Sequence, residues 1–334
     1  MADLDYQVRD RSLLLPWYKK YVVEPAVAWF PRSLHPNTIT HAGHLLNLAG
    51  LLVVLAVGSP SGGAAYAVAA VLLQAYNFCD NADGAHARRT GQSSALGELL
   101  DHGLDLLNVA YISALAALTI GASPLVTALL VTAITGAAAI TYWEQAETGV
   151  FQLGLLNQVE ATLTLSFSLL VAARFGPQVF GAHLGPVAVR DLIAAVVVVG
   201  AVAGMLGAGR RVARRGGALL PLATQVLFGA AVALATAAGA LDPVVGAVAG
   251  ATGYVFLGVR NLTLRMAGRK PLLETGVLVL ALVLMAEAVT SMTGRSAGAL
   301  ATNLTAALGT GCLVLLVLVH ARRGLRMVSG KRAG

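Results

Sequence analysis

The chain contains the stretch Asp80-Asn-Ala-Asp83-Gly84-Ala-His-Ala87-Arg88 and, after eight more residues, Gly97-Glu-Leu-Leu-Asp101-His-Gly-Leu-Asp105. Its aspartates stand in a sequence that is 57% hydrophobic and only 12% charged. Spacings of three and four residues place both members of a pair on one face of a helix. Four converging carboxylates would repel one another without a counter-ion. The pattern therefore predicts a site for divalent cations, and oxygen ligands favour Mg²⁺, Mn²⁺ or Ca²⁺ over zinc.

Two glycines and an arginine beside the acids indicate a phosphate ligand. Gly84 and Gly97 remove side chains where a ligand must approach the backbone. Arg88 offers a planar guanidinium that suits phosphate oxygens. Alternatively, the acids only cap helix ends and pair with Arg88 and Arg89. The number of acids at helical spacing favours the metal and phosphate site.

Long apolar runs recur along the whole chain and predict an all-α, polytopic transmembrane bundle. Acidic residues at membrane depth are costly and indicate function. We predict about ten spans, preceded by amphipathic helices in the membrane interface within residues 11–34. The spans are 39–58, 62–79, 97–120, 124–143, 159–174, 190–209, 217–240, 243–259, 272–292 and 298–320.

The basic residues predict the orientation. With a cytosolic N-terminus, all 23 lysines and arginines except Arg174, Arg190 and Arg295 fall on the cytosolic side. The acidic motif then lies at the cytosolic face of the membrane. In a bacterium this membrane would be the inner membrane. Topology and anionic lipid explain the net charge of +7, so no nucleic-acid partner is expected.

No linker divides the chain, so we predict one integral-membrane domain over residues 1–334. It would comprise a cytosolic interfacial segment (1–38), catalytic helices (39–210) and additional transmembrane helices (211–334). Charged and polar residues persist from Ala2 to Thr40, which argues against a cleavable signal peptide.

The motif resembles the signature of the CDP-alcohol phosphotransferases, Asp-x2-Asp-Gly-x2-Ala-Arg-x8-Gly-x3-Asp-x3-Asp, and matches it at every fixed position. Further segments resemble the choline/ethanolamine phosphotransferase branch of that family. They include Arg88-Arg89-Thr90, Leu96-Gly97-Glu98-Leu99, Pro36-Asn37-Thr38 and Val159-Glu160. The resemblance is strong to about residue 160 and looser afterwards.

The resemblance implies roles for individual residues. Asp80, Asp83, Asp101 and Asp105 would bind metal, expected to be two ions of Mg²⁺ or Mn²⁺. The nucleotide site would be formed by Gly84, Ala87, Arg88 and Gly97, with Asn37 and Asn77 as further contacts. A lipid hydroxyl would attack the β-phosphorus of the donor and release CMP.

Two carboxylates are candidates for the general base. The resemblance implies Asp105. Glu160 is the second, because it enters an apolar span where loss of water favours uptake of a proton. Alternatively, Glu160 is a structural partner of a polar group such as Asn157.

The expected reaction joins CDP-choline or CDP-ethanolamine to diacylglycerol. A rival within the same family uses CDP-diacylglycerol as donor and a small alcohol, such as glycerol phosphate or inositol, as acceptor. A cation transporter is a third reading, although transporter sites usually lie near the membrane midplane. The resemblance also suggests a homodimer, for which the residues show no interface.

Overall fold

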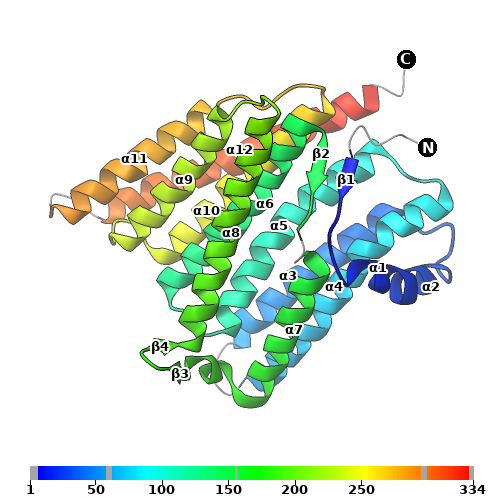
Figure 1. Ribbon diagram of the computed structural model, residues 1–334, viewed down its shortest axis with the longest axis horizontal. Helices are drawn as coiled ribbons and strands as arrows, with labels where there is room; N and C mark the ends of the chain where they lie inside the picture. Colours follow the sequence, from blue (N-terminus) through cyan, green and yellow to red (C-terminus); the bar gives the residue numbers. More distant parts are fainter. Residues whose placement is uncertain (1–6, 58–61, 155–156, 295–298, 331–334) are drawn as a thin grey trace. The chain divides into compact units, whose positions relative to one another are not determined.

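The computed structural model describes residues 7–57, 62–154, 157–294 and 299–330, and its long elements are all α-helices (Figure 1). The predicted all-α class is confirmed for these residues. The long helices are α3 (Pro36–Val57), α4 (Gly63–Thr90), α5 (Ala95–Thr119), α6 (Pro124–Thr148), α7 (Gln158–Phe175), α8 (Val189–Arg214), α9 (Leu220–Ala237), α10 (Pro243–Met266), α11 (Thr275–Met292) and α12 (Ala299–Gly330).

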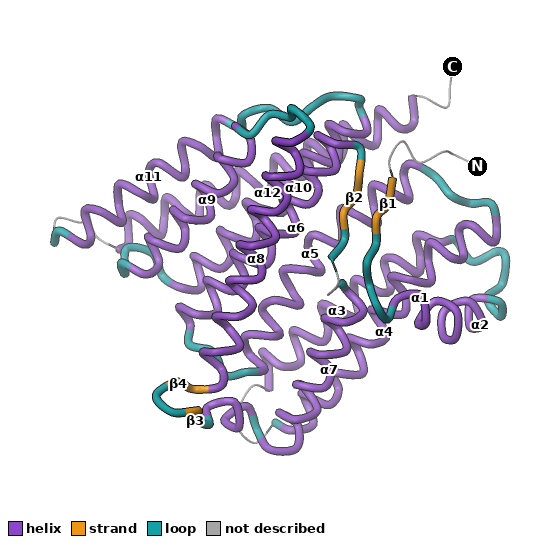
Figure 2. The backbone as a smooth tube through the Cα atoms, viewed as in Figure 1, coloured by secondary structure: helices purple, strands orange, loops and turns teal. Residues whose placement is uncertain are grey.

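Short elements precede and interrupt these helices. The N-terminal region forms a strand, β1 (Gln7–Arg9), and then α1 (Leu15–Tyr18), the π-helix η1 (Lys19–Val23) and α2 (Glu24–Val27). β1 pairs in parallel with β2 (Val150–Gln152), as Figure 2 shows. Between α7 and α8 lie the 3-10 helix η2 (Pro177–Gly181) and the antiparallel pair β3 (His183–Leu184) and β4 (Val187–Ala188).

Six of the helices are long and apolar enough to cross a membrane, namely α3, α6, α8, α9, α10 and α11. The protein is therefore an integral membrane protein. The spans predicted over 62–79, 97–120, 159–174 and 298–320 fall on α4, α5, α7 and α12, which are helices outside that set of six. Residue 58 of the first predicted span, residue 298 of the last, and Arg295 lie outside the described residues.

The chain divides into two compact units, each with its own interior. Unit 1 consists of Met1–Gly121 and Val150–Arg190, and unit 2 of Ala122–Gly149 and Asp191–Gly334. All four aspartates of the motif belong to unit 1. The predicted single domain remains a prediction.

The interior of unit 1 is built by close approach of α3 and α4. A Cβ at Gly43 would lie 2.8 Å from the Cβ of Cys79, which is nearer than real side chains approach. Small residues allow such approach in membrane helices. Beyond this contact, apolar residues of α3, α4, α5 and α7 form one buried cluster, which includes Leu51, Val54, Tyr66, Leu73, Leu115 and Leu169. This packing fixes α4, the helix that carries the first acidic pair.

In unit 2, α10 packs against α6, α9 and α12. The ring of Tyr254 occupies the space left by Gly136 and Gly229, and its hydroxyl donates a 2.8 Å hydrogen bond to the Gln225 carbonyl. The Arg211 guanidinium donates two hydrogen bonds, of 2.6 and 2.7 Å, to the buried Glu144 carboxylate. These two contacts join α10 to α9 and α8 to α6.

Candidate active site

The connection between α4 and α5 is short and well capped. α4 ends at Gly91, whose φ of 72° places it in the left-handed region that glycine favours. The Ser94 hydroxyl then accepts a 3.0 Å hydrogen bond from the Gly97 N–H at the start of α5. As a result, the last turns of α4 and the first turns of α5 are held at the same end of the unit.

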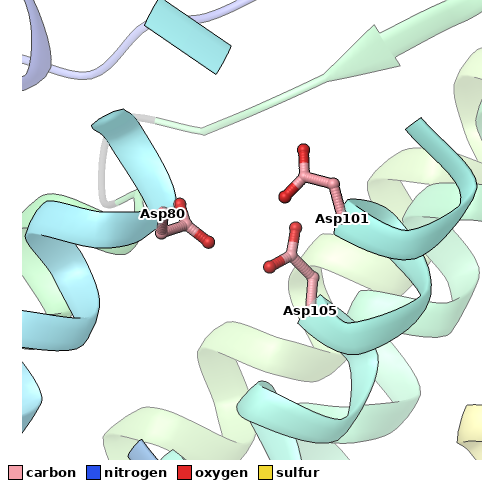
Figure 3. Close-up of side chains that lie close together, drawn as sticks. All are labelled: Asp80, Asp101 and Asp105. Carbon is pink, nitrogen blue, oxygen red and sulfur yellow. The ribbon is translucent and has the colours of Figure 1, made fainter. Parts of the chain in front are cut away.

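Three of the four aspartates converge across this connection. One carboxylate oxygen each of Asp80, Asp101 and Asp105 lies within 4.8 Å of the others. Figure 3 shows Asp101 and Asp105, from one helix, pointing toward Asp80 on the other. Ligand oxygens sit roughly 2.0–2.6 Å from Mg²⁺ or Ca²⁺, so two oxygens on one ion are about 4–5 Å apart at most. The three carboxylates could therefore hold one ion.

Asp83 is placed differently. Its side chain is buried, and its Oδ2 accepts a 2.5 Å hydrogen bond from the Thr40 hydroxyl on α3. Its Oδ1 accepts a second bond, also 2.5 Å, from the N–H of Gly84. Asp83 thus links α3 to the acidic turn of α4, and its role as a metal ligand remains a prediction. Thr40 is a site residue that spacing alone did not reveal.

His102 lies beside the acids on α5. Its Nδ1 is 3.7 Å from Asp105 Oδ2, and its ring centre is 5.5 Å from that of Phe151 on β2. The imidazole therefore sits between the carboxylate cluster and the short parallel sheet. At this separation the two groups interact through charge when the imidazole is protonated.

The glycines of the motif leave room for polar neighbours. A Cβ at Gly84 would lie 3.4 Å from Arg88 Nη1. At Gly97, a Cβ would lie 3.4 Å from Asn37 Oδ1, which places the Asn37 side chain at the start of α5. Arg88 itself is exposed, one residue beyond the half-buried Ala87. Of the six predicted nucleotide contacts, Gly84 thus lies near Arg88 in the last turns of α4. Asn37 of α3 lies near Gly97 at the start of α5.

Asn77 lies one turn before Asp80 and is fully buried. Neither its Oδ1 nor its Nδ2 forms a hydrogen bond of ordinary geometry in the part of the chain that the structure describes, and the Tyr18 hydroxyl is the polar group that interacts with this amide. Buried polar groups without partners are costly and call for an explanation. A bound polar ligand would supply the missing partner, which is consistent with the predicted nucleotide contact.

Residues 7–34, hereafter the N-terminal strap, run beside this site. The strap is anchored first by the pairing of β1 with β2 and then by Glu160 at the start of α7. The Glu160 carboxylate accepts hydrogen bonds from the Ser12 hydroxyl (2.6 Å), the Leu14 N–H (2.9 Å) and the Asn157 N–H (3.1 Å). Glu160 and Asn157 form a capping box. These contacts agree with the reading of Glu160 as a structural partner.

The other end of the strap is anchored by the last turns of α4. The Arg89 guanidinium donates to the carbonyls of Val27 (2.7 Å), Ala28 (2.9 Å) and Phe30 (2.9 Å). His86 Nε2 lies 2.9 Å from the Leu34 carbonyl. Arg89 therefore binds the C-terminal end of α2, whereas the alternative reading had it paired with the motif's acids.

Comparison with known proteins identifies the class to which this fold and site belong. Residues 33–203, just over half of the chain, match the family model described as CDP-alcohol phosphatidyltransferase. The chain belongs to this family of membrane enzymes, and the resemblance read from the motif is confirmed.

Individual relatives match the chain over part of their length. Cholinephosphotransferase 1 of Gallus gallus is 32% identical over 186 residues, covering 52% of this chain and 54% of the relative. Ethanolaminephosphotransferase 1 of Homo sapiens is 30% identical over 199 residues, covering 53% and 50%. Choline/ethanolaminephosphotransferase 1 of Saccharomyces cerevisiae is 36% identical over 110 residues, covering 31% and 27%. The chain spans about half the length, or less, of these relatives.

The carboxylate cluster generates a prediction that does not depend on activity. A cation that binds only the folded protein stabilises it, by about 2.7 kcal/mol at a hundredfold excess over its dissociation constant. We expect Mn²⁺ or Mg²⁺ to raise the thermal unfolding midpoint of the purified protein, and Asp101→Asn to abolish most of that rise. The matched control is Glu24→Gln, which removes an exposed carboxylate outside the cluster. An equal rise in both variants would contradict metal binding by Asp101.

Proposed function

We propose that this enzyme transfers phosphocholine or phosphoethanolamine from the corresponding CDP-alcohol to the hydroxyl of diacylglycerol and releases CMP. The observation that carries the proposal is the convergence of Asp80, Asp101 and Asp105 at the ends of α4 and α5, beside Arg88. The names of the similar proteins support the head-group donors over CDP-diacylglycerol.

The proposed roles follow the positions of the side chains. Asp80, Asp101 and Asp105 would hold divalent metal, with Asp83 as the predicted fourth ligand and with Mg²⁺ or Mn²⁺, in two ions, as the predicted occupants. Bound metal would neutralise the donor diphosphate and stabilise CMP as it leaves. Gly84, Ala87, Arg88 and Gly97 would line the nucleotide site together with Asn37 and Asn77. The acceptor diacylglycerol would enter from the bilayer.

Asp105 is the proposed general base. The hydroxyl oxygen of diacylglycerol forms a bond to the β-phosphorus, and the bond from that phosphorus to the oxygen bridging to the α-phosphate breaks. The hydroxyl proton passes to an Asp105 oxygen, and the bridging oxygen leaves on CMP. A carboxylate has two oxygens, so Asp105 can offer one to metal and the other to the proton. Positioning and charge neutralisation do most of the catalysis in such phosphoryl transfers.

Glu160 fits an anchoring role better than proton transfer. Its carboxylate already accepts three hydrogen bonds, two of them from the strap. A base occupied by three donors is poorly placed to take a further proton. We therefore assign Glu160 to holding the strap and Asp105 to the chemistry.

An assay with purified protein tests the reaction. We expect CMP release when diacylglycerol and Mg²⁺ are supplied with CDP-choline or CDP-ethanolamine. Asp105→Asn should lower turnover by about a hundredfold or more, since loss of one catalytic group typically has an effect of that size. Asp191→Asn, which changes an exposed carboxylate in the first turn of α8, should keep it. Release only from CDP-diacylglycerol plus glycerol phosphate or inositol would reverse the donor and acceptor. Release from no combination, with metal-driven cation flux instead, would indicate a transporter.

The anchoring role of Glu160 predicts that Glu160→Gln and Ser12→Ala act alike. Each removes part of the same contact, so both should increase amide hydrogen exchange in residues 11–18 and lower turnover to a similar, moderate extent of about tenfold or less. Loss of turnover in Glu160→Gln with unchanged exchange would instead favour Glu160 as the base.

We also propose that α4, α5, α7 and α12 complete about ten crossings, with the acidic motif at the cytosolic face. The distribution of basic residues supports this orientation. A single cysteine at position 92, introduced after replacing Cys79 and Cys312, should react with an impermeant maleimide only from the cytosolic side. A cysteine at position 186 should react only from the opposite side. The reverse pattern would invert the topology.

The predicted homodimer should appear as a dimer mass by native mass spectrometry.

A further inference from the structure

The middle of the N-terminal strap lies against the turn of α4 that carries the acids. Val23 and Val27 of the strap are buried at 0% and 2% exposure in a cluster with Ile39 and Ala82. Ala82 stands between Asp80 and Asp83 in the chain. In Figure 1 the dark-blue α1 and α2 run beside α4, consistent with the contacts of η1 and α2 with that helix. The strap thus covers the flank of the carboxylate cluster.

The element in the middle of the strap is a π-helix, η1, in which the Glu24 N–H donates to the Lys19 carbonyl. Single π-helical turns are often found at functional sites. Lys19 precedes the buried Val23 by four residues, so the two lie near the same face of the element. Lys19 is accordingly half-buried, whereas its neighbour Lys20 is exposed, with its ammonium 5.1 Å from the Tyr21 ring centre.

The charge around Lys19 is unusual for a lysine. Burial lowers the pKa of Lys19, and the nearby Arg88 lowers it further, while Asp10, Asp80 and Glu24 act in the opposite direction. The preceding residue, Tyr18, also lies near the acidic turn of α4. Burial raises the pKa of its phenol, and the nearby Cys79 and Asp80 raise it further. Lys19 is therefore close enough to both Arg88 and Asp80 for their charges to act on it.

Neither Lys19 nor Arg88 forms an ion pair with a carboxylate of the described residues. Two unpaired cations close together repel each other, and an anion bound between them removes that repulsion. The adjoining carboxylates could hold a divalent cation. An anion bound there would then contact that cation as well as Lys19 and Arg88. A diphosphate has charge and oxygen atoms enough to contact both.

We propose that Lys19, together with Arg88, binds the diphosphate of the nucleotide donor, so that the N-terminal strap forms one wall of the donor site. The inference rests on the proposed function, because the diphosphate belongs to the CDP-alcohol. Lys19 is then a substrate-binding residue contributed from outside the Asp80–Asp105 motif. The two anchors of the strap, at Glu160 and Arg89, hold it in place.

The test compares Lys19→Met with Lys20→Met, since methionine keeps an unbranched stem and removes the charge at adjacent positions. Dissociation constants for CDP and for CMP are measured by calorimetry in the presence of Mg²⁺, separately from turnover. A hydrogen bond to a charged group contributes enough for its loss to weaken binding about tenfold or more. We expect that loss of CDP affinity in Lys19→Met, less than about twofold change in Lys20→Met, and recovery in Lys19→Arg.

Kinetics add a second readout. In Lys19→Met the KM for the CDP-alcohol should rise about tenfold or more, while the KM for diacylglycerol stays within about twofold. Unchanged CDP affinity in Lys19→Met, or equal losses in both methionine variants, would overturn the inference. If Lys19→Met fails to fold, Lys19→Gln is measured in its place. Failure of the proposed function is seen separately, as absence of CMP release from CDP-choline and CDP-ethanolamine by the wild-type protein.

Discussion

Mutual repulsion among Asp80, Asp101 and Asp105 is the constraint that governs unit 1. Their oxygens approach within 4.8 Å of one another, at helix ends where an unneutralised set of charges is unfavourable. The fold holds them there through close packing of α3 on α4 at Gly43 and through the capped turn between α4 and α5. A bound divalent cation would neutralise these charges, so the arrangement suits a metal site.

Around this cluster, hydrogen bonds hold the acidic turn of α4 and both ends of the strap in place. Asp83 is held by Thr40 and by its neighbour Gly84, and Arg89 binds three strap carbonyls. Glu160 binds the other end of the strap. These hydrogen bonds fix the positions of the three charged side chains. Among the described residues, Arg88 and Lys19 form no such hydrogen bond or ion pair, so both can meet an anionic substrate.

Unit 2 contains none of the motif's acids, and its buried Glu144 carboxylate is paired with Arg211. Ionic pairing inside an apolar helix bundle avoids the cost of isolated charge. The same physical rule therefore operates in both units with different outcomes. In unit 2 it pairs Glu144 with Arg211, and in unit 1 it leaves a cluster of carboxylates that could hold a metal ion.

The sequence by itself determined the helical membrane class, the family and the acids of the motif, because apolar length and helical spacing are local properties. It also predicted Asn37 and Gly97 separately, without indicating that they approach each other. Only the tertiary structure decided that Asp83 is bound by Thr40, that Glu160 anchors residues 12–14, and that Lys19 comes within range of the charge of Arg88. Those contacts join segments up to 148 residues apart in the chain. Spacing cannot reveal them, since they depend on how the helices pack and on where the strap crosses α4.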